Sequence, residues 1–127
     1  MEIEDKIHYI LTQGYIDISV FQDWEMDIFY LSEAECEFSI GGVGSYFENS
    51  TRLHADQLKL ALIKYGENEI AFCIENIQNI IKGKEEITEE SEDELSIYYD
   101  KMEKYLDDSQ LGQLITRIYN DNGYFNS

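Results

Sequence analysis

The chain has 127 residues, 43% of them apolar and 13% aromatic, which is enough to fold with a buried core. Its 27 acidic residues against 9 Lys and Arg give a formal net charge of −18. This charge argues against direct nucleic-acid binding, which needs a basic surface, and against an anionic membrane surface. We expect a single domain over residues 1–127.

Helical periodicity dominates the chain, and proline is absent, so an all-α fold is expected. The first predicted helix runs from Glu2 to Gln13 and is closed by Gly14. Residues 15–21 alternate apolar and polar side chains, as a strand does. No second run of this kind follows to pair with them, so a connector is expected there instead.

A long second helix is expected from Asp23, its capping residue, to about Ile40. Three carboxylates are expected to lie largely off its apolar face: Asp27, Glu33 and Glu37. Glu35 falls close to the apolar stripe, where a free carboxylate is costly. We therefore expect Glu35 to accept hydrogen bonds from backbone N–H groups of the loop that follows.

That loop, residues 41–50, contains three glycines within four positions: Gly41, Gly42 and Gly44. It is not a dinucleotide-binding loop, because Phe47 stands where G-x-G-x-x-G requires glycine, and no Gly-Lys-Ser/Thr follows. Ser45 and Glu48 have the spacing of a capping box, which predicts a short helical turn that buries Phe47. We interpret the glycines as structural.

Four further helices are expected in the second half of the chain, which makes about six in one compact bundle with a glycine-rich loop. They are Ala55 to Tyr65 before Gly66, Glu67 to Lys82 before Gly83, Glu92 to about Leu106 after a capping box of Ser91 and Glu94, and Asp108 or Ser109 to Asn122. The first two should form a helical hairpin. Residues 84–91 are expected to be a solvated loop.

Charge is unevenly distributed along the chain. Residues 1–51 carry 11 acids and one base, residues 52–84 carry 4 acids and 5 bases, and residues 85–127 carry 12 acids and 3 bases. The two acidic flanks predict an acidic partner-binding surface built from both ends of the chain. Its candidate residues are Asp23, Asp27, Glu33, Glu85, Glu86, Glu89, Glu90, Glu92, Asp93 and Glu94. The alternative is that these runs are ordinary solvated faces.

The residues that usually hold metals or carry catalysis are few. His8 and His54 are the only histidines, and Cys36 and Cys73 lie far apart, so we expect no metal site and no cofactor. Free thiols are expected, as in a reducing compartment, and no secretory signal pattern is found near residue 1. A cytoplasmic protein is therefore predicted.

Residues 34–50 resemble the motif E-x-E-V-N-N-G-G-F-x-Q-[FY]-[FY]-x-N-S of a family of small bacterial helical proteins, one of which is a DNA mimic. The matching positions are Glu35, Glu37, Gly41, Gly42, Tyr46, Phe47, Asn49 and Ser50. The sequence departs from the motif at Ser39, Ile40, Val43 and Ser45. The resemblance covers about residues 21–122 and implies an all-α domain, a homodimer, and an acidic surface that imitates DNA phosphates to occupy a DNA-binding regulator.

The leading hypothesis is a non-enzymatic acidic protein that binds a basic, DNA-binding protein surface, with direct nucleic-acid and membrane binding excluded. Two alternatives remain open. One is an immunity or antitoxin-like protein that neutralises a cationic nuclease. The other is a small enzyme with a site at Gly41–Asn49 that uses Glu35, Glu37 or His54. If acidity served solubility alone, the carboxylates would be scattered evenly over the surface.

Overall fold

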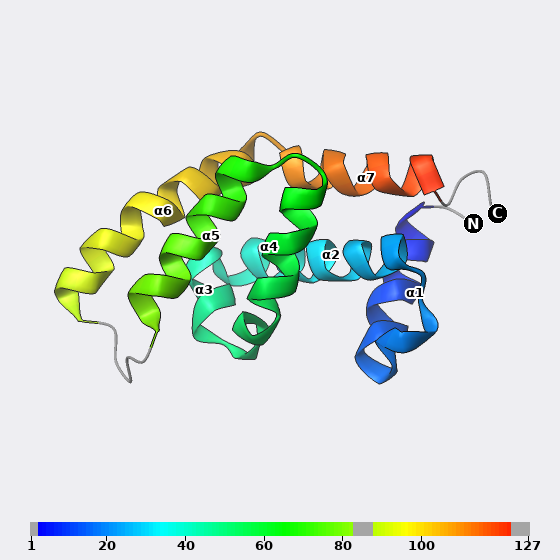
Figure 1. Cartoon of the computed structure of the whole chain (residues 1–127), viewed down its shortest axis with the longest axis horizontal. Coiled ribbons are helices and arrows are strands. Elements are labelled where there is room, and N and C mark those ends of the chain that lie inside the picture. Colours follow the sequence, from blue (N-terminus) through cyan, green and yellow to red (C-terminus); the bar gives the residue numbers. More distant parts are fainter. Residues whose placement is uncertain (1–2, 83–87, 123–127) are drawn as a thin grey trace.

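The computed structural model describes residues 3–82 and 88–122, and these residues form an all-α protein (Figure 1). Its α-helices are α1 (Ile3–Ile16), α2 (Asp23–Gly41), α3 (Val43–Glu48), α4 (Ala55–Lys64), α5 (Asn68–Ile81), α6 (Glu89–Asp107) and α7 (Gln110–Asn122). Two short 3-10 helices, η1 (Ile18–Val20) and η2 (Ser50–His54), connect them. The predicted all-α class is confirmed, and α3 is the short helical turn expected in the glycine-rich loop beside the six longer helices.

Helix α2 lies at the centre of the fold. It contacts α1, α3, α4 and α7; in Figure 1 it runs beside α7 along the long axis while α4 crosses it. Four consecutive side chains of α2 are buried, Leu31, Ser32, Glu33 and Ala34, and at about 100° per residue they point in all directions around its axis. A helix that is packed on several sides buries residues all round its axis. The polar residues of α2 must therefore find partners inside the structure.

The predicted hairpin of α4 and α5 is present, and Gly66 makes it. Gly66 has a φ of 87°, in the left-handed region that favours glycine. Its N–H donates to the Ile63 carbonyl at 3.1 Å, and the Glu67 N–H donates to the Leu62 carbonyl at 2.8 Å. These bonds satisfy carbonyls at the end of α4 and turn the chain into α5.

Two helix starts differ from the sequence prediction. Helix α6 begins at Glu89, not Glu92, because the Thr88 side chain caps it by accepting a hydrogen bond from the Ser91 N–H at 3.2 Å. Helix α2 begins after Gln22, which forms a capping box with Glu25, so Asp23 is inside the helix and is not its cap.

The expected capping box of Ser45 and Glu48 is also wrong. Helix α3 begins after Gly42, which has a φ of 82°, and the Ser45 hydroxyl bonds to Glu37 instead. The expected loop at residues 84–91 falls partly outside the described residues, and Glu85 and Glu86 lie entirely outside them. Among the described helices, none is long and apolar enough to cross a membrane.

Gly14 does not end α1, which continues to Ile16. A Cβ atom at Gly14 would overlap the ring of Phe29, so the glycine allows α1 to approach α2 closely. The signal that predicted a helix end is thus explained by a contact with a residue 15 positions later in the sequence.

Gly14→Ala should therefore destabilise the protein by about 1–3 kcal/mol, because the new methyl group must displace the Phe29 ring. Urea unfolding measures the change. Gly44→Ala is the matched control: its Cβ would meet Tyr99 at an ordinary contact distance of 3.4 Å, so a neutral effect or a gain of up to about 1 kcal/mol is expected. Equal effects at both sites would contradict the close-approach explanation.

Candidate functional site

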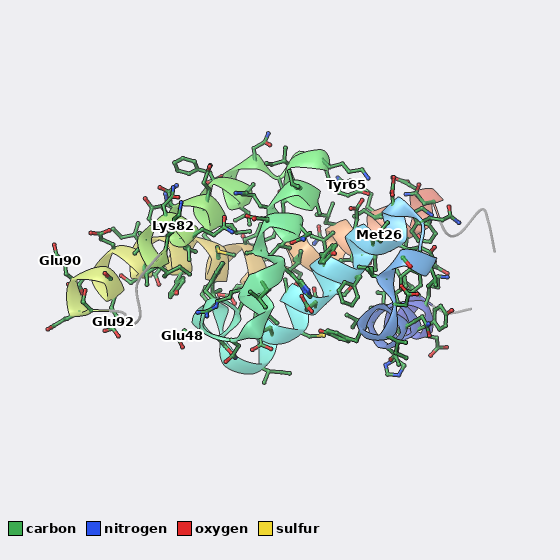
Figure 2. All side chains as sticks on the ribbon, turned by 60° about the horizontal axis from the view of Figure 1, so that its bottom comes forward. Met26, Glu48, Tyr65, Lys82, Glu90 and Glu92 are labelled. Carbon is green, nitrogen blue, oxygen red and sulfur yellow. The ribbon has the colours of Figure 1, made fainter. Side chains whose placement is uncertain are left out.

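The largest gathering of exposed carboxylates on the predicted list lies at the start of α6. Five of the six residues from 89 to 94 are acidic and exposed, and the sixth, Ser91, is buried. Figure 2 shows Glu90 and Glu92 at one extreme of the molecule. With two exposed acids further along the helix, these residues form what we call the α6 acidic face: Glu89, Glu90, Glu92, Asp93, Glu94, Asp100 and Asp107.

Part of this face forms a line along the helix. Four carboxylates fall within about 40° of one another around the axis, at about 100° per residue: Glu89, Asp93, Asp100 and Asp107. At a rise of about 1.5 Å per residue their successive Cα atoms are about 6, 10.5 and 10.5 Å apart along the axis. The opposite side of α6 is buried through Leu95 and Met102. The line therefore points away from the core.

The acids of α2 do not join this face. Asp23 is exposed at the start of α2, close to Met26, which Figure 2 shows far from Glu90 and Glu92. Asp27 has a side chain only 16% exposed and accepts hydrogen bonds from Lys64 Nζ at 2.8 Å and Tyr65 Oη at 2.7 Å. Burial, and then the bond to Asp27, raise the pKa of Tyr65. The structure thus keeps Asp23 and Asp27 apart from the acids at the start of α6.

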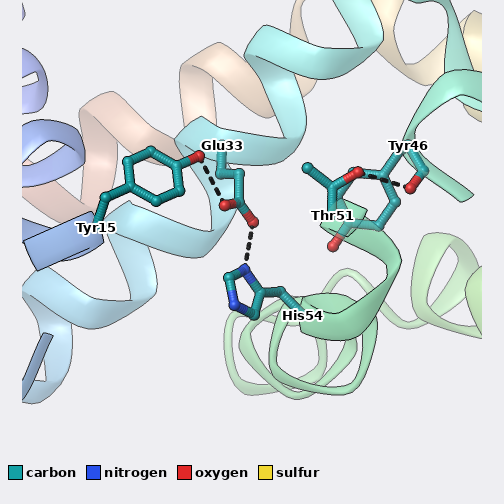
Figure 3. A network of polar contacts seen from close by, with 5 residues as sticks. All are labelled: Tyr15, Glu33, Tyr46, Thr51 and His54. Carbon is teal, nitrogen blue, oxygen red and sulfur yellow. Dashed lines mark hydrogen bonds and ion pairs between the residues drawn. The ribbon is translucent and has the colours of Figure 1, made fainter. Parts of the chain in front are cut away.

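Glu33 is the clearest departure from the predicted surface. Its side chain is 3% exposed, although we expected it off the apolar face and available to a partner. Its carboxylate accepts hydrogen bonds from Tyr15 Oη at 2.7 Å and His54 Nδ1 at 2.8 Å (Figure 3). Burial, then this bond and the charge of Glu33, raise the pKa of Tyr15. Glu33 joins α1, α2 and η2 and is not open to a partner.

The glycine-rich loop is held by two carboxylates. Glu37 accepts from Ser45 Oγ at 2.7 Å and Asn49 Nδ2 at 2.8 Å, and these bonds lower the pKa of Glu37. Glu103 of α6 accepts from the backbone N–H of Val43 at 3.2 Å. We expected an amide of this loop to donate to Glu35. The Val43 amide donates instead to Glu103, which is 60 positions further along the chain than Val43.

Residues inside the loop serve packing. Tyr46 and Phe47 are buried, and the Thr51 hydroxyl donates to the Tyr46 carbonyl at 2.7 Å (Figure 3). A Cβ atom at Gly41 would press on Ser45, and Gly42 has a positive φ. These contacts support the interpretation of the loop as a structural turn.

Glu35 is half-buried where α2 meets α7. A Cβ atom at Gly112 would lie 3.2 Å from its Oε2 atom, which shows how closely α7 passes. Within the described part of the chain we find no hydrogen bond to the Glu35 carboxylate. Burial raises the pKa of Glu35 above its usual value of 4.5.

The three residues that the enzyme alternative would use, Glu35, Glu37 and His54, each have a different neighbour in the structure. Glu37 is bound by the loop, His54 by Glu33, and Glu35 lies against α7. Among residues 3–82 and 88–122 no group of three or more His, Cys, Asp or Glu is placed to hold a metal ion. Both cysteines are free; Cys36 is exposed and Cys73 is buried.

Comparisons of the chain with protein-family models, with curated proteins and with solved structures give no match. The resemblance of residues 34–50 to the DNA-mimic family therefore stays a prediction from the sequence.

Glu33→Ala should lower the free energy of unfolding by about 1–3 kcal/mol, because it removes a buried carboxylate and its hydrogen bonds to Tyr15 and His54, whose side chains water can still reach. Urea denaturation tests this. Glu75→Ala, an exposed position in the middle of α5, should change stability by less than about 0.5 kcal/mol. A Glu33→Ala protein as stable as the Glu75→Ala control would show that the network contributes nothing.

Glu35→Gln should stabilise the protein at about pH 7. Because burial raises the pKa of Glu35, the folded state holds this proton more tightly than the unfolded chain does. Below pH 4.5 the carboxyl group is protonated in both states and does not affect stability. Above the folded pKa it is ionised in both states, and its burial then destabilises the folded state in full. The gain over the unmodified protein should shrink as the pH falls to 4.5 and below.

Glu37→Gln is the opposite-sign control. The pKa of Glu37 is lowered, so its carboxylate contributes stability above the usual 4.5 that is lost as the pH falls through the folded value. This variant should be destabilised at about pH 7, with a difference that shrinks in acid. If the two variants change in stability in the same direction across this pH range, the opposite pKa shifts assigned to Glu35 and Glu37 are refuted.

Proposed function

We propose that this protein is non-enzymatic and binds a basic surface of a DNA-binding protein, with the α6 acidic face in the position that DNA phosphates would occupy. The observation that carries the proposal is the exposed run of five carboxylates within residues 89–94. These span about 7.5 Å of helix, whereas one strand of duplex DNA carries one charge per about 3.4 Å. Counted along the axis, and over all the directions in which these side chains point, the charge per unit length is at least that of a DNA strand.

Helix stabilisation explains only part of this arrangement. Acids in the first turn of α6, such as Glu89 and Glu90, favour the helix by facing its positive end. Asp107 lies at the negative end, where a carboxylate is unfavourable for the helix. Asp100 is in the middle, where the dipole has little effect. The line of acids therefore extends beyond what stabilises the helix, and binding to a cationic partner would explain the remaining acids.

The face is also supported by a rigid helix. Leu95 and Met102 fix α6 on the core, and its first turn is capped by Thr88. Lys101 and Lys104 are exposed on the same helix, so its charge is not uniformly negative. A fixed row of charges with local exceptions would select a partner by position as well as by charge.

The proposal includes the family's homodimer and a cytoplasmic location. Two free cysteines fit a reducing compartment. A cationic nuclease would fit the same face as a DNA-binding regulator does. Capture experiments distinguish these two partners, because a recovered nuclease cleaves DNA whereas a recovered regulator only binds it.

Immobilised protein should capture a basic protein from native lysate at low salt and release it when duplex DNA or salt is added, because phosphates and salt compete for the same cations. Conversion of Glu89, Glu90, Glu92, Asp93 and Glu94 to their amides should weaken this capture by at least about ten-fold. The same measurement on a variant with five exposed acids changed elsewhere (Glu4, Asp5, Asp17, Glu48 and Glu69) keeps the net charge equal.

Equal losses in the two variants would mean that net charge alone drives capture, which contradicts a defined face. Capture that duplex DNA cannot displace would contradict the DNA-like position. Circular dichroism of both variants checks that the helices are intact.

A further inference from the structure

A cavity between η2, α4 and α5 gathers three of the nine Lys and Arg residues of this acidic chain: Arg52, Lys59 and Lys82. Its volume is about 390 Å³, within the range of small-molecule sites, and far too small for a nucleic-acid duplex. Phe47, Ala55 and Ile81 supply its apolar lining. The cavity therefore combines a partly apolar lining with cations from η2, from α4 and from the end of α5.

One wall of the cavity is fixed by a polar network. Lys59 Nζ donates to Gln78 Oε1 at 3.1 Å and lies 3.7 Å from Asp56 Oδ1. Gln78 Nε2 donates to the same Asp56 oxygen at 2.9 Å. The negative charge of Asp56 is thus already engaged by its neighbours, and Lys59 is held in place with a side chain only 22% exposed.

The other two cationic side chains of the cavity are not fixed by a neighbouring carboxylate in the described part of the chain. Arg52 and Lys82 are exposed, and neither has an ion-pair partner among the described residues. Glu75 is the second carboxylate that lines the cavity, and it is exposed. Three cations against two carboxylates leave this lining positive in a chain of net charge −18. Because charges beyond about 8 Å are screened at physiological salt, the local lining decides what binds here.

We propose that this cavity binds a small molecule that carries an oxyanion, a phosphate or a carboxylate group. Arg52 presents a planar fork of donors that matches either group with two hydrogen bonds. Lys82 supplies a second charge, while the charge of Lys59 is offset by Asp56, 3.7 Å away. The apolar lining at Ile81 receives the uncharged part of the ligand. This site is separate from the α6 acidic face and does not depend on the proposed function.

Titrations by two-dimensional NMR, with inorganic phosphate and citrate as separate probes, test the site. Chloride keeps the ionic strength constant, because salt alone stabilises a chain with this much self-repulsion. A saturable shift of backbone signals around residues 52, 59, 78 and 82 is expected. Comparison of the two probes shows whether phosphate or carboxylate is preferred.

Variants should move the dissociation constant in opposite directions. The double change Arg52→Gln and Lys82→Gln should weaken binding by about ten-fold or more, whereas Glu75→Gln should tighten it by several-fold, because it removes a repelling carboxylate. Two controls carry the same charge changes outside the cavity: Lys101→Gln with Lys104→Gln, and Glu69→Gln, which lies on the same helix as Glu75.

All the altered side chains are exposed, so the fold should be retained. Absence of a saturable shift with both probes would overturn the proposal. So would control variants that change the affinity as much as the cavity variants do, since binding would then follow net charge and not the site.

Discussion

The burial of α2 on several sides is the constraint on which the rest of the structure depends. This helix contains six acidic residues yet contacts four other helices, so most of its carboxylates cannot stay in water. A buried charge without partners costs several kcal/mol, and here the partners come from elsewhere in the chain. Glu25 binds Lys6 at 3.0 Å, Asp27 binds Lys64, and Glu33 binds Tyr15 and His54. These three acids of α2 thus act as links between elements.

The same residue type has a different role on α6. There the helix packs by one side only, through residues such as Leu95 and Met102, and its acids lie in water on the other. Of the acids of α6, only Glu103 is partly buried, and it accepts a backbone bond from Val43. Net charge alone therefore overstates the acid available to a partner. Burial divides the carboxylates into those that hold the fold together and those that a cationic surface could reach.

Local patterns in the sequence were sufficient for the fold class, for most helices and for the turn at Gly66, because each depends on residues a few positions apart. Contacts between distant residues were not predictable in this way. Gly14 resembles a helix stop but faces Phe29, and Glu33 resembles a surface acid but meets partners 18 and 21 positions away. One signal was available: Ser32 and Ala34, small residues on both sides of Glu33, suit a helix that is closely packed all round.

The glycine-rich loop connects the central helix to the helix that carries the exposed acids. Its Val43 amide is bound by Glu103, and the ring of Phe47 stacks on Tyr99 with centroids 6.2 Å apart, so two residues of α6 are tied to the segment that follows α2. The loop thus fixes α6, and with it the acidic face, relative to the central helix. A surface that is already ordered loses less entropy when a partner binds. The turn that looked like a site in the sequence contributes to function by holding in place the helix that carries the exposed acids.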